Sequence, residues 1–120
     1  MTENLRSAIE KAELTQKSLI ALTSQETTFD QRELARLRSL LQHDMLAISR
    51  LSREDEDLRS DRSRFAEFKE RQNAVHSELS QHQAQWLIPQ IEKDRAGYEK
   101  ATRQIRKSQE DFFIWAKQNV

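Results

Sequence analysis

Residues 29–58 read FDQRELARLRSLLQHDMLAISRLSREDEDL, and this stretch decides the fold. Asp30 is a residue type that caps helix N-termini, and Glu33 stands three residues later, where its side chain can return the bond. Phe29 and Leu34 occupy the two positions of a hydrophobic staple across that start. The sequence therefore predicts a helix that begins at Asp30.

Large apolar residues recur behind that start at steps of three, four and seven: Leu34, Leu37, Leu41, Met45, Ile48, Leu51 and Leu58. This spacing places them along one side of a helix, where they form an apolar seam that a second helix must cover. The predicted helix-packing residues of the seam are Leu34, Leu37, Leu41, Ile48, Leu51 and Leu58.

The composition also favours an all-α fold. The 120 residues include one Gly and one Pro, too few for the turns that a sheet protein needs. Apolar residues make up 36% of the chain, less than in ordinary globular domains, which favours an elongated helical assembly over a compact globule. The zero net charge and the regular apolar spacing argue against a disordered chain.

We therefore predict an extended antiparallel helical bundle, or coiled coil, of three to four long helices that forms a single unit over residues 1–120. The predicted helices span about residues 2–23, 30–59, 61–88 and 89–118. A short polar connection at residues 23–28 favours antiparallel packing of the first two helices.

Two joins are less certain from sequence. Residues 52–64 contain Leu58 as their only large apolar residue, and two structures fit them. The chain can turn there, with Ser60 or Ser63 as the N-cap of the next helix, or it can continue as one helix of about 80 Å. Compactness favours the turn. Pro89 cannot donate to the carbonyl of Gln85, so we expect a kink or a tight join at that point.

Two aromatic clusters, at residues 86–88 and 112–115, place large apolar side chains at consecutive positions. Neighbouring residues on a helix point about 100° apart, so one stripe cannot bury all of them. The second surface is either the wide core of a four-helix bundle or a protein partner. The candidate partner interface consists of Trp86, Leu87, Ile88, Phe112, Phe113 and Trp115. The dense apolar end of the sequence fits either a docked terminus or the cut end of a longer protein.

No catalytic, cofactor-binding or metal-binding residue is predicted. The chain has no Cys and three His, two of which, His76 and His82, would lie on opposed faces of one helix. A single Gly rules out a glycine-rich phosphate loop. We expect no small-molecule substrate, and no apolar run approaches the length of a membrane span.

We predict a non-enzymatic structural or adaptor protein of the cytoplasm. It would associate with itself or bind a helical protein, and a narrower form of this prediction is an assembly factor or chaperone. Its partner would be a second copy or another coiled-coil chain. The alternative is an accessory protein that binds nucleic acid through two basic stripes, although acidic residues interrupt both and the net charge is zero. The stripes consist of Arg32, Arg36 and Arg38, and of Lys100, Arg103, Arg106 and Lys107.

Overall fold

A computed structural model describes residues 1–24 and 29–120, and this part of the chain is helical and contains no strand. The all-α prediction is thereby confirmed. The helices are α1 (Glu3–Thr23), α2 (Gln31–Glu54), α3 (Glu56–Arg59), α4 (Arg62–Gln85), α5 (Ile88–Lys93) and α6 (Arg95–Asn119). Residues 25–28, which include most of the predicted connection at 23–28, lie outside the described residues.

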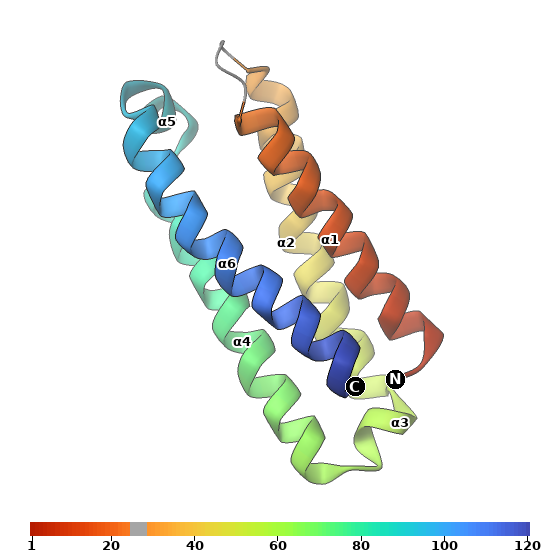
Figure 1. Cartoon of the computed structure of the whole chain (residues 1–120). Coiled ribbons are helices and arrows are strands. Elements are labelled where there is room, and N and C mark those ends of the chain that lie inside the picture. The colour runs from red at the N-terminus through yellow and green to blue at the C-terminus, as the bar shows by residue number, and fades with distance from the viewer. Residues whose placement is uncertain (25–28) are drawn as a thin grey trace.

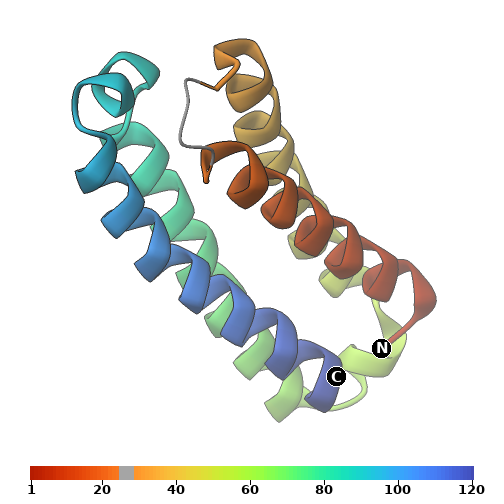
Figure 2. The ribbon, with the colours of Figure 1, turned by 45° about the horizontal axis from the view of Figure 1, so that its top comes forward.

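The long helices form two helical pairs, α1 with α2 and α4 with α6, which lie side by side (Figures 1 and 2). Both chain termini lie at the end beside α3, and α5 lies at the other end (Figure 1). Hydrogen bonds join Gln42 of α2 to Gln83 of α4, and Lys69 of α4 to Ser49 of α2, so these two helices run antiparallel. The pairs are thus joined through α3 and through packing of α2 on α4 and of α1 on α6.

The molecule is more compact than the sequence suggested. It measures 48 × 20 × 20 Å, and its radius of gyration of 15.1 Å is close to the ~13.6 Å expected for a compact chain of this length. The continuous helix of about 80 Å is therefore wrong. The reason is that the chain turns back at residues 55–61, between α2 and α4, and stacks one helical pair on the other.

Aspartate side chains cap the start of four helices. Asp30 accepts hydrogen bonds from the backbone nitrogens of Arg32 and Glu33, which confirms the predicted start of α2. Asp55, Asp61 and Asp94 cap α3, α4 and α6 in the same way. The expectation that Ser60 or Ser63 caps α4 is therefore wrong, because Asp61 takes that role.

The chain turns at Pro89 through a tight join, as predicted. The helix α4 ends at Gln85 rather than near residue 88, and Pro89 lies in the first turn of α5, where its missing N–H leaves no intrahelical bond unmade. The predicted helix at 89–118 is two helices, because Asp94 ends α5 and caps α6 with a bond from the Gly97 nitrogen. A Cβ at Gly97 would overlap the Asp94 carboxylate that caps α6 and would lie 3.0 Å from the Trp86 ring, so glycine permits this close join.

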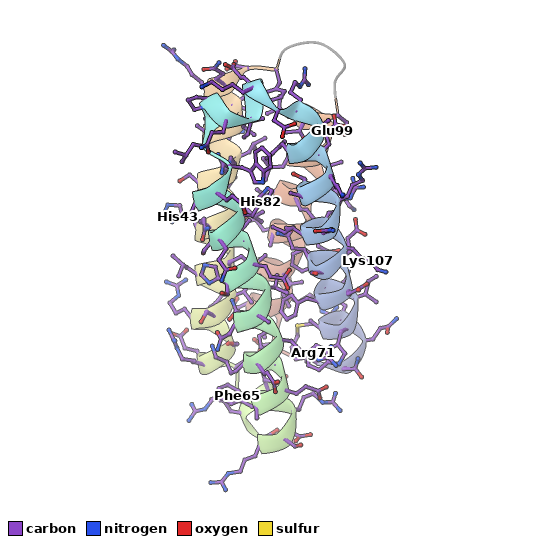
Figure 3. The ribbon with its side chains drawn as sticks, turned by 90° about the vertical axis from the view of Figure 1, so that its left-hand side faces the viewer. His43, Phe65, Arg71, His82, Glu99 and Lys107 are labelled. Atoms are coloured by element: carbon purple, nitrogen blue, oxygen red, sulfur yellow. The ribbon has the colours of Figure 1, made fainter. Side chains whose placement is uncertain are left out.

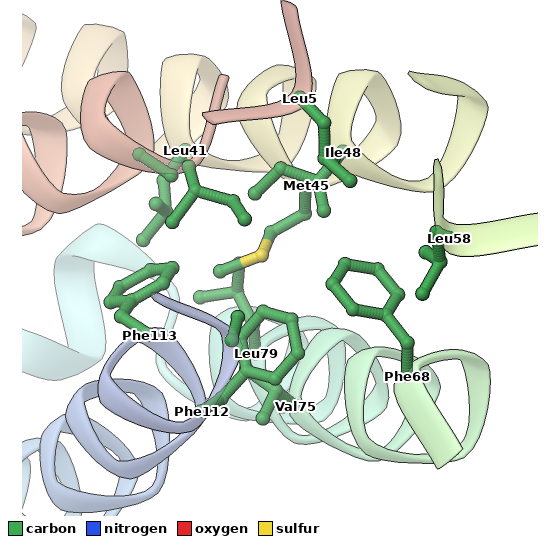
Figure 4. Close-up of a cluster of buried hydrophobic side chains, with 13 residues drawn as sticks. Leu5, Leu41, Met45, Ile48, Leu58, Phe68, Val75, Leu79, Phe112 and Phe113 are labelled. Atoms are coloured by element: carbon green, nitrogen blue, oxygen red, sulfur yellow. The ribbon is translucent and has the colours of Figure 1, made fainter. Parts of the chain in front are cut away.

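The main core lies where the two helical pairs meet (Figure 4). Met45 of α2 lies at its centre, with Phe113 of α6 and Phe68 of α4 around it (Figure 4). A smaller cluster of Leu34, Ile91 and Tyr98 lies near α5, and the predicted staple residue Phe29 packs against it. Both clusters bury the apolar face of α2, which is therefore the helix around which the chain is packed.

Candidate functional site

The apolar seam of residues 29–58 faces the interior. Leu34, Leu37, Leu41, Met45, Ile48 and Leu58 are buried, and Leu51 is half-buried against the main core. Within one chain the seam is covered by α1 and α4, and Phe112 and Phe113 of α6 join it in the main core. Six of its seven members are thus unavailable to a partner.

Phe112 and Phe113 belong to the main core and not to a partner interface, which corrects that part of the sequence prediction. Their side chains are 3% and 1% exposed, and the Phe112 ring packs edge-on against Phe68 at 5.5 Å between centroids. The physical reason is that α6 packs against both α4 and α1, so two of its faces are buried instead of one. Consecutive aromatic residues can then both point inward.

The other members of the candidate interface are distributed between core and surface. Leu87 is 55% exposed, whereas Ile88 is half-buried against the smaller cluster. Trp86 packs on the Tyr98 ring at 5.7 Å. Trp115 is half-buried, with the Arg71 guanidinium 4.5 Å from its ring centroid. Leu87 is therefore the one large side chain of the six that lies mainly in solvent.

The outer face of α2 carries a better-defined surface, here called the α2 ridge: Ser39, His43, Leu46 and Arg50. These residues recur at steps of four, three and four, and all are exposed; the exposed fraction of Leu46 is 55%. Figure 3 labels His43, which marks the position of the ridge. One groove on the α4 side is lined by Ala35, Gln42, Gln83 and Ile88, and another on the α1 side by Ala8, Lys11, Asp44 and Ala47.

A ridge between two grooves is the surface that a packing helix requires, because helices pack by laying the ridge of one into the groove of another. The groove toward α4 extends from Ala35 to Leu46, which corresponds to about 16 Å or three helical turns. Leu46 and His43 border both grooves. Leu14 of α1, by comparison, is 64% exposed and lines neither groove.

A second site, here called the chamber, lies between the helical pairs. All four long helices line it, with Leu19, Leu41, Leu79 and Ile105 among its apolar residues and Gln16, Arg38, His82, Tyr98, Thr102, Arg106 and Gln109 among its polar ones. Its inner volume is about 40 Å³, and it adjoins an outer groove of about 240 Å³ between α1 and α6. Tyr98, Thr102 and Arg106 line both spaces.

Hydrogen bonds fix several side chains of the chamber. The Gln16 Nε2 donates to Gln109 Oε1 at 2.7 Å, and a guanidinium nitrogen of Arg38 donates to the Gln83 carbonyl at 2.9 Å. The Thr102 hydroxyl lies 3.4 Å from His82 Nε2, and the imidazole stacks on the Tyr98 ring at 5.4 Å. The polar side chains that line the chamber therefore form a hydrogen-bonded layer across the bundle.

Burial shifts the pKa values of three side chains that line the chamber: His82, Tyr98 and Arg38. It lowers the pKa of His82 to about 4, with the Arg38 charge acting in the same direction, so the imidazole is neutral at pH 7. Burial also raises the pKa of Tyr98, which keeps the phenol protonated. Arg38 has its pKa lowered by burial, yet a guanidinium remains charged in proteins. The fixed charges of the chamber are thus those of Arg38 and Arg106.

The structure divides the predicted basic stripes: Arg32, Arg36, Lys100, Arg103 and Lys107 are exposed, whereas Arg38 and Arg106 are half-buried. Arg36 pairs with Glu33 at 2.6 Å, and Arg38 and Arg106 line the chamber. Lys107, next to Arg106, is exposed on the outside of α6 (Figure 3). Among the described residues, no group of three or more His, Cys, Asp or Glu side chains is placed to hold a metal ion.

Sequence reasoning did not find the chamber. Its polar residues come from all four long helices. Those of α6, at positions 98, 102, 106 and 109, share one helix face, but no local spacing connects them to positions 16, 38 and 82. One signal was present: His82 stands at a seam position where an apolar residue is expected. A polar residue in a seam predicts a buried polar contact but does not identify its partner.

No protein-family model matches the chain, and neither a curated protein nor a solved structure matches it. None of the described helices combines the length and the apolar character that a bilayer-spanning segment requires.

Proposed function

We propose that this chain is a non-enzymatic association module that binds a helix, from a second copy or from another coiled-coil protein, on its α2 ridge. The observation that carries the proposal is the exposed Leu46 between two grooves, of which the one toward α4 is three helical turns long. Ala35 and Ala47 beside the ridge are small, which supports close approach of a partner backbone. An assembly factor or chaperone of the cytoplasm is the narrower form of this proposal.

Nucleic-acid binding receives less support. A phosphate-binding face needs several exposed cations along one surface. Arg36 is paired with Glu33, and Arg38 and Arg106 line the chamber. The exposed cations that remain on α6 are Lys100, Arg103 and Lys107, and the acidic Glu99 and Glu110 stand among them. Salt separates the two functions, because phosphate binding weakens steeply as salt is added whereas apolar packing does not.

The test replaces Leu46 with Glu and uses Leu14→Glu as the matched control, since both leucines are more than half exposed. Burial of a leucine side chain contributes about 1.5–3 kcal/mol, so we expect Leu46→Glu to weaken association by roughly tenfold to a hundredfold. Leu14→Glu should leave it unchanged. The measurement is molar mass by light scattering or sedimentation over a wide concentration range, together with circular dichroism to verify folding.

Equal loss of association in the two variants would contradict the α2 ridge as the binding surface. A mass of one chain at every concentration would remove self-association. The proposal would then require a helical partner whose binding is lost in Leu46→Glu and kept in Leu14→Glu.

A further inference from the structure

The chamber concentrates positive charge and hydrogen-bond donors. Arg38 approaches from α2 and Arg106 from α6, and no carboxylate among the described residues forms an ion pair with either. Glu99 is the acidic residue that lines the outer groove, where Arg103 also lies. The inner space has no acidic lining residue. An anion would therefore find two cations and no carboxylate in the inner chamber.

Gln109 supplies a donor that the protein does not use. Its side chain is 3% exposed, and its Nε2 has no hydrogen-bond partner among the described residues. The amide orientation follows from its neighbour: Gln16 Nε2 lies 3.4 Å from the Arg106 carbonyl and 2.7 Å from Gln109 Oε1, so Gln109 must present its oxygen to Gln16. Its NH₂ group is then left to donate elsewhere. A buried donor without a partner destabilises the fold, and a ligand that accepts a hydrogen bond from it removes that cost.

The size of the chamber limits the ligand. The inner volume of about 40 Å³ exceeds the ~10–15 Å³ that a cavity needs to hold one water molecule and is far below the ~300 Å³ of the smallest drug-sized pockets. One small polyatomic group fits there, and any larger part of the ligand would extend into the outer groove.

We propose that the chamber binds a small oxyanion, the phosphate or carboxylate group of a metabolite or the free ion, through Arg38, Arg106 and Gln109. The planar guanidinium group donates two parallel hydrogen bonds to such oxygens, and the amide nitrogen adds a third donor. The Thr102 hydroxyl lies at the boundary of the inner chamber and the outer groove, where it can donate to the same group. The site lies between the helical pairs, and Arg38 and Gln83 line both the chamber and the groove on the α4 side of the α2 ridge.

The test titrates inorganic phosphate, and separately acetate, into the ¹⁵N-labelled full chain at pH 7, with chloride replaced to keep ionic strength constant. We expect a saturating shift of the Gln109 side-chain amide signals. Arg106→Met should weaken binding about tenfold or more, because a charge-assisted bidentate contact is lost. Lys107→Met, which removes the same charge from the adjacent exposed position, should leave binding within about twofold.

Saturation by phosphate but not acetate would assign the site to phosphoryl groups, and the reverse would assign it to carboxylates. The absence of a saturating shift with either ion in the unaltered protein would overturn the proposal. Equal weakening in Arg106→Met and Lys107→Met would also overturn it, because it would indicate general surface charge. If Arg106→Met fails to fold, Gln109→Leu serves in its place, with the same expected loss and the backbone amide signals of residues 98–106 as readout.

Discussion

At the scale of single residues, the interior of this protein is more polar than its apolar seam suggested. Thr15, Gln16, Asp44, Gln72 and Gln109 are all buried. Most of them have partners from another helix, such as the 2.6 Å bond from the Thr15 hydroxyl to Asp44. Bonded polar side chains can fill interior space without a large desolvation cost. This explains how a chain with 36% apolar residues forms a compact body.

Gln72 is buried with only one of its two polar atoms hydrogen-bonded, and this leads to a prediction. Its Nε2 donates to the Met45 carbonyl at 3.1 Å, but its Oε1 has no partner among the described residues and the side chain is 0% exposed. Gln72→Met keeps the length of the side chain and removes the unpaired oxygen. We expect a gain of about 1 kcal/mol in unfolding free energy, or about 4 °C in Tm for a chain of this size.

The measurement is thermal unfolding followed by circular dichroism, with exposed Asn73→Met as the control. A lower Tm in Gln72→Met would show instead that the Gln72 amide stabilises the packing of α4 on α2. Gln72 stands at a seam position of α4, but its partner Met45 lies 27 residues away and only the fold brings them together.

At the scale of elements, the sequence predicted those helix boundaries that are determined by neighbouring residues. Asp30 and Pro89 act within a few residues of themselves. The structure starts α2 directly after Asp30 and places Pro89 in the first turn of α5, just after α4 ends at Gln85. The join between α2 and α4 was ambiguous because residues 52–64 contain neither Gly nor Pro. Asp55 stabilises the turn through Thr2, a contact across 53 residues that local sequence cannot reveal.

The contacts of Asp55 allow us to predict how the join between α2 and α4 responds to mutation and to pH. It is 1% exposed and accepts bonds from the backbone nitrogens of Leu58 and Thr2 and from the Thr2 hydroxyl. Asp55→Ala removes the α3 cap and leaves the Thr2 groups unpaired, so we expect a loss of about 2 kcal/mol at pH 7. Denaturant unfolding measures it, with the neighbouring exposed Glu56→Ala as a control that should change by about 0.5 kcal/mol or less.

The pH dependence has a definite sign. Burial raises the pKa of Asp55, but the bonds from Leu58 and Thr2 outweigh it, and the pKa lies below its ordinary value. The stabilisation is therefore complete above the unfolded-state pKa of about 3.9 and is lost as pH falls through the lower folded-state pKa. The stability difference between the unaltered protein and Asp55→Ala should narrow below pH 4. A difference that stays constant down to pH 2 would contradict this role.

At the scale of the whole molecule, the sequence predicted helices that bury a seam but not how many faces of each helix are buried. The periodicity of α2 identifies one apolar stripe, and the structure buries that stripe. The sequence F-F-I-W at residues 112–115 has no single stripe, because α6 contacts α4 on one side and α1 on another. Whether such a run is core or interface depends on the number of neighbours, which is a property of the tertiary arrangement.

Adjacent residues of that run provide the last prediction. Phe113 is 1% exposed and packs in the main core near Leu41 and Met45 (Figure 4), whereas Ile114 is 50% exposed. Phe113→Ala should cost about 3–5 kcal/mol, because it removes a buried ring and leaves a cavity where the two helical pairs meet. Ile114→Ala should cost about 0.5 kcal/mol or less. Denaturant unfolding of the isolated chain measures both. Phe113→Ala would contradict this assignment if it left stability unchanged but reduced the mass of an oligomer. The ring would then belong to an interface between chains, and α6 would not pack against α1 and α4 in solution as it does here.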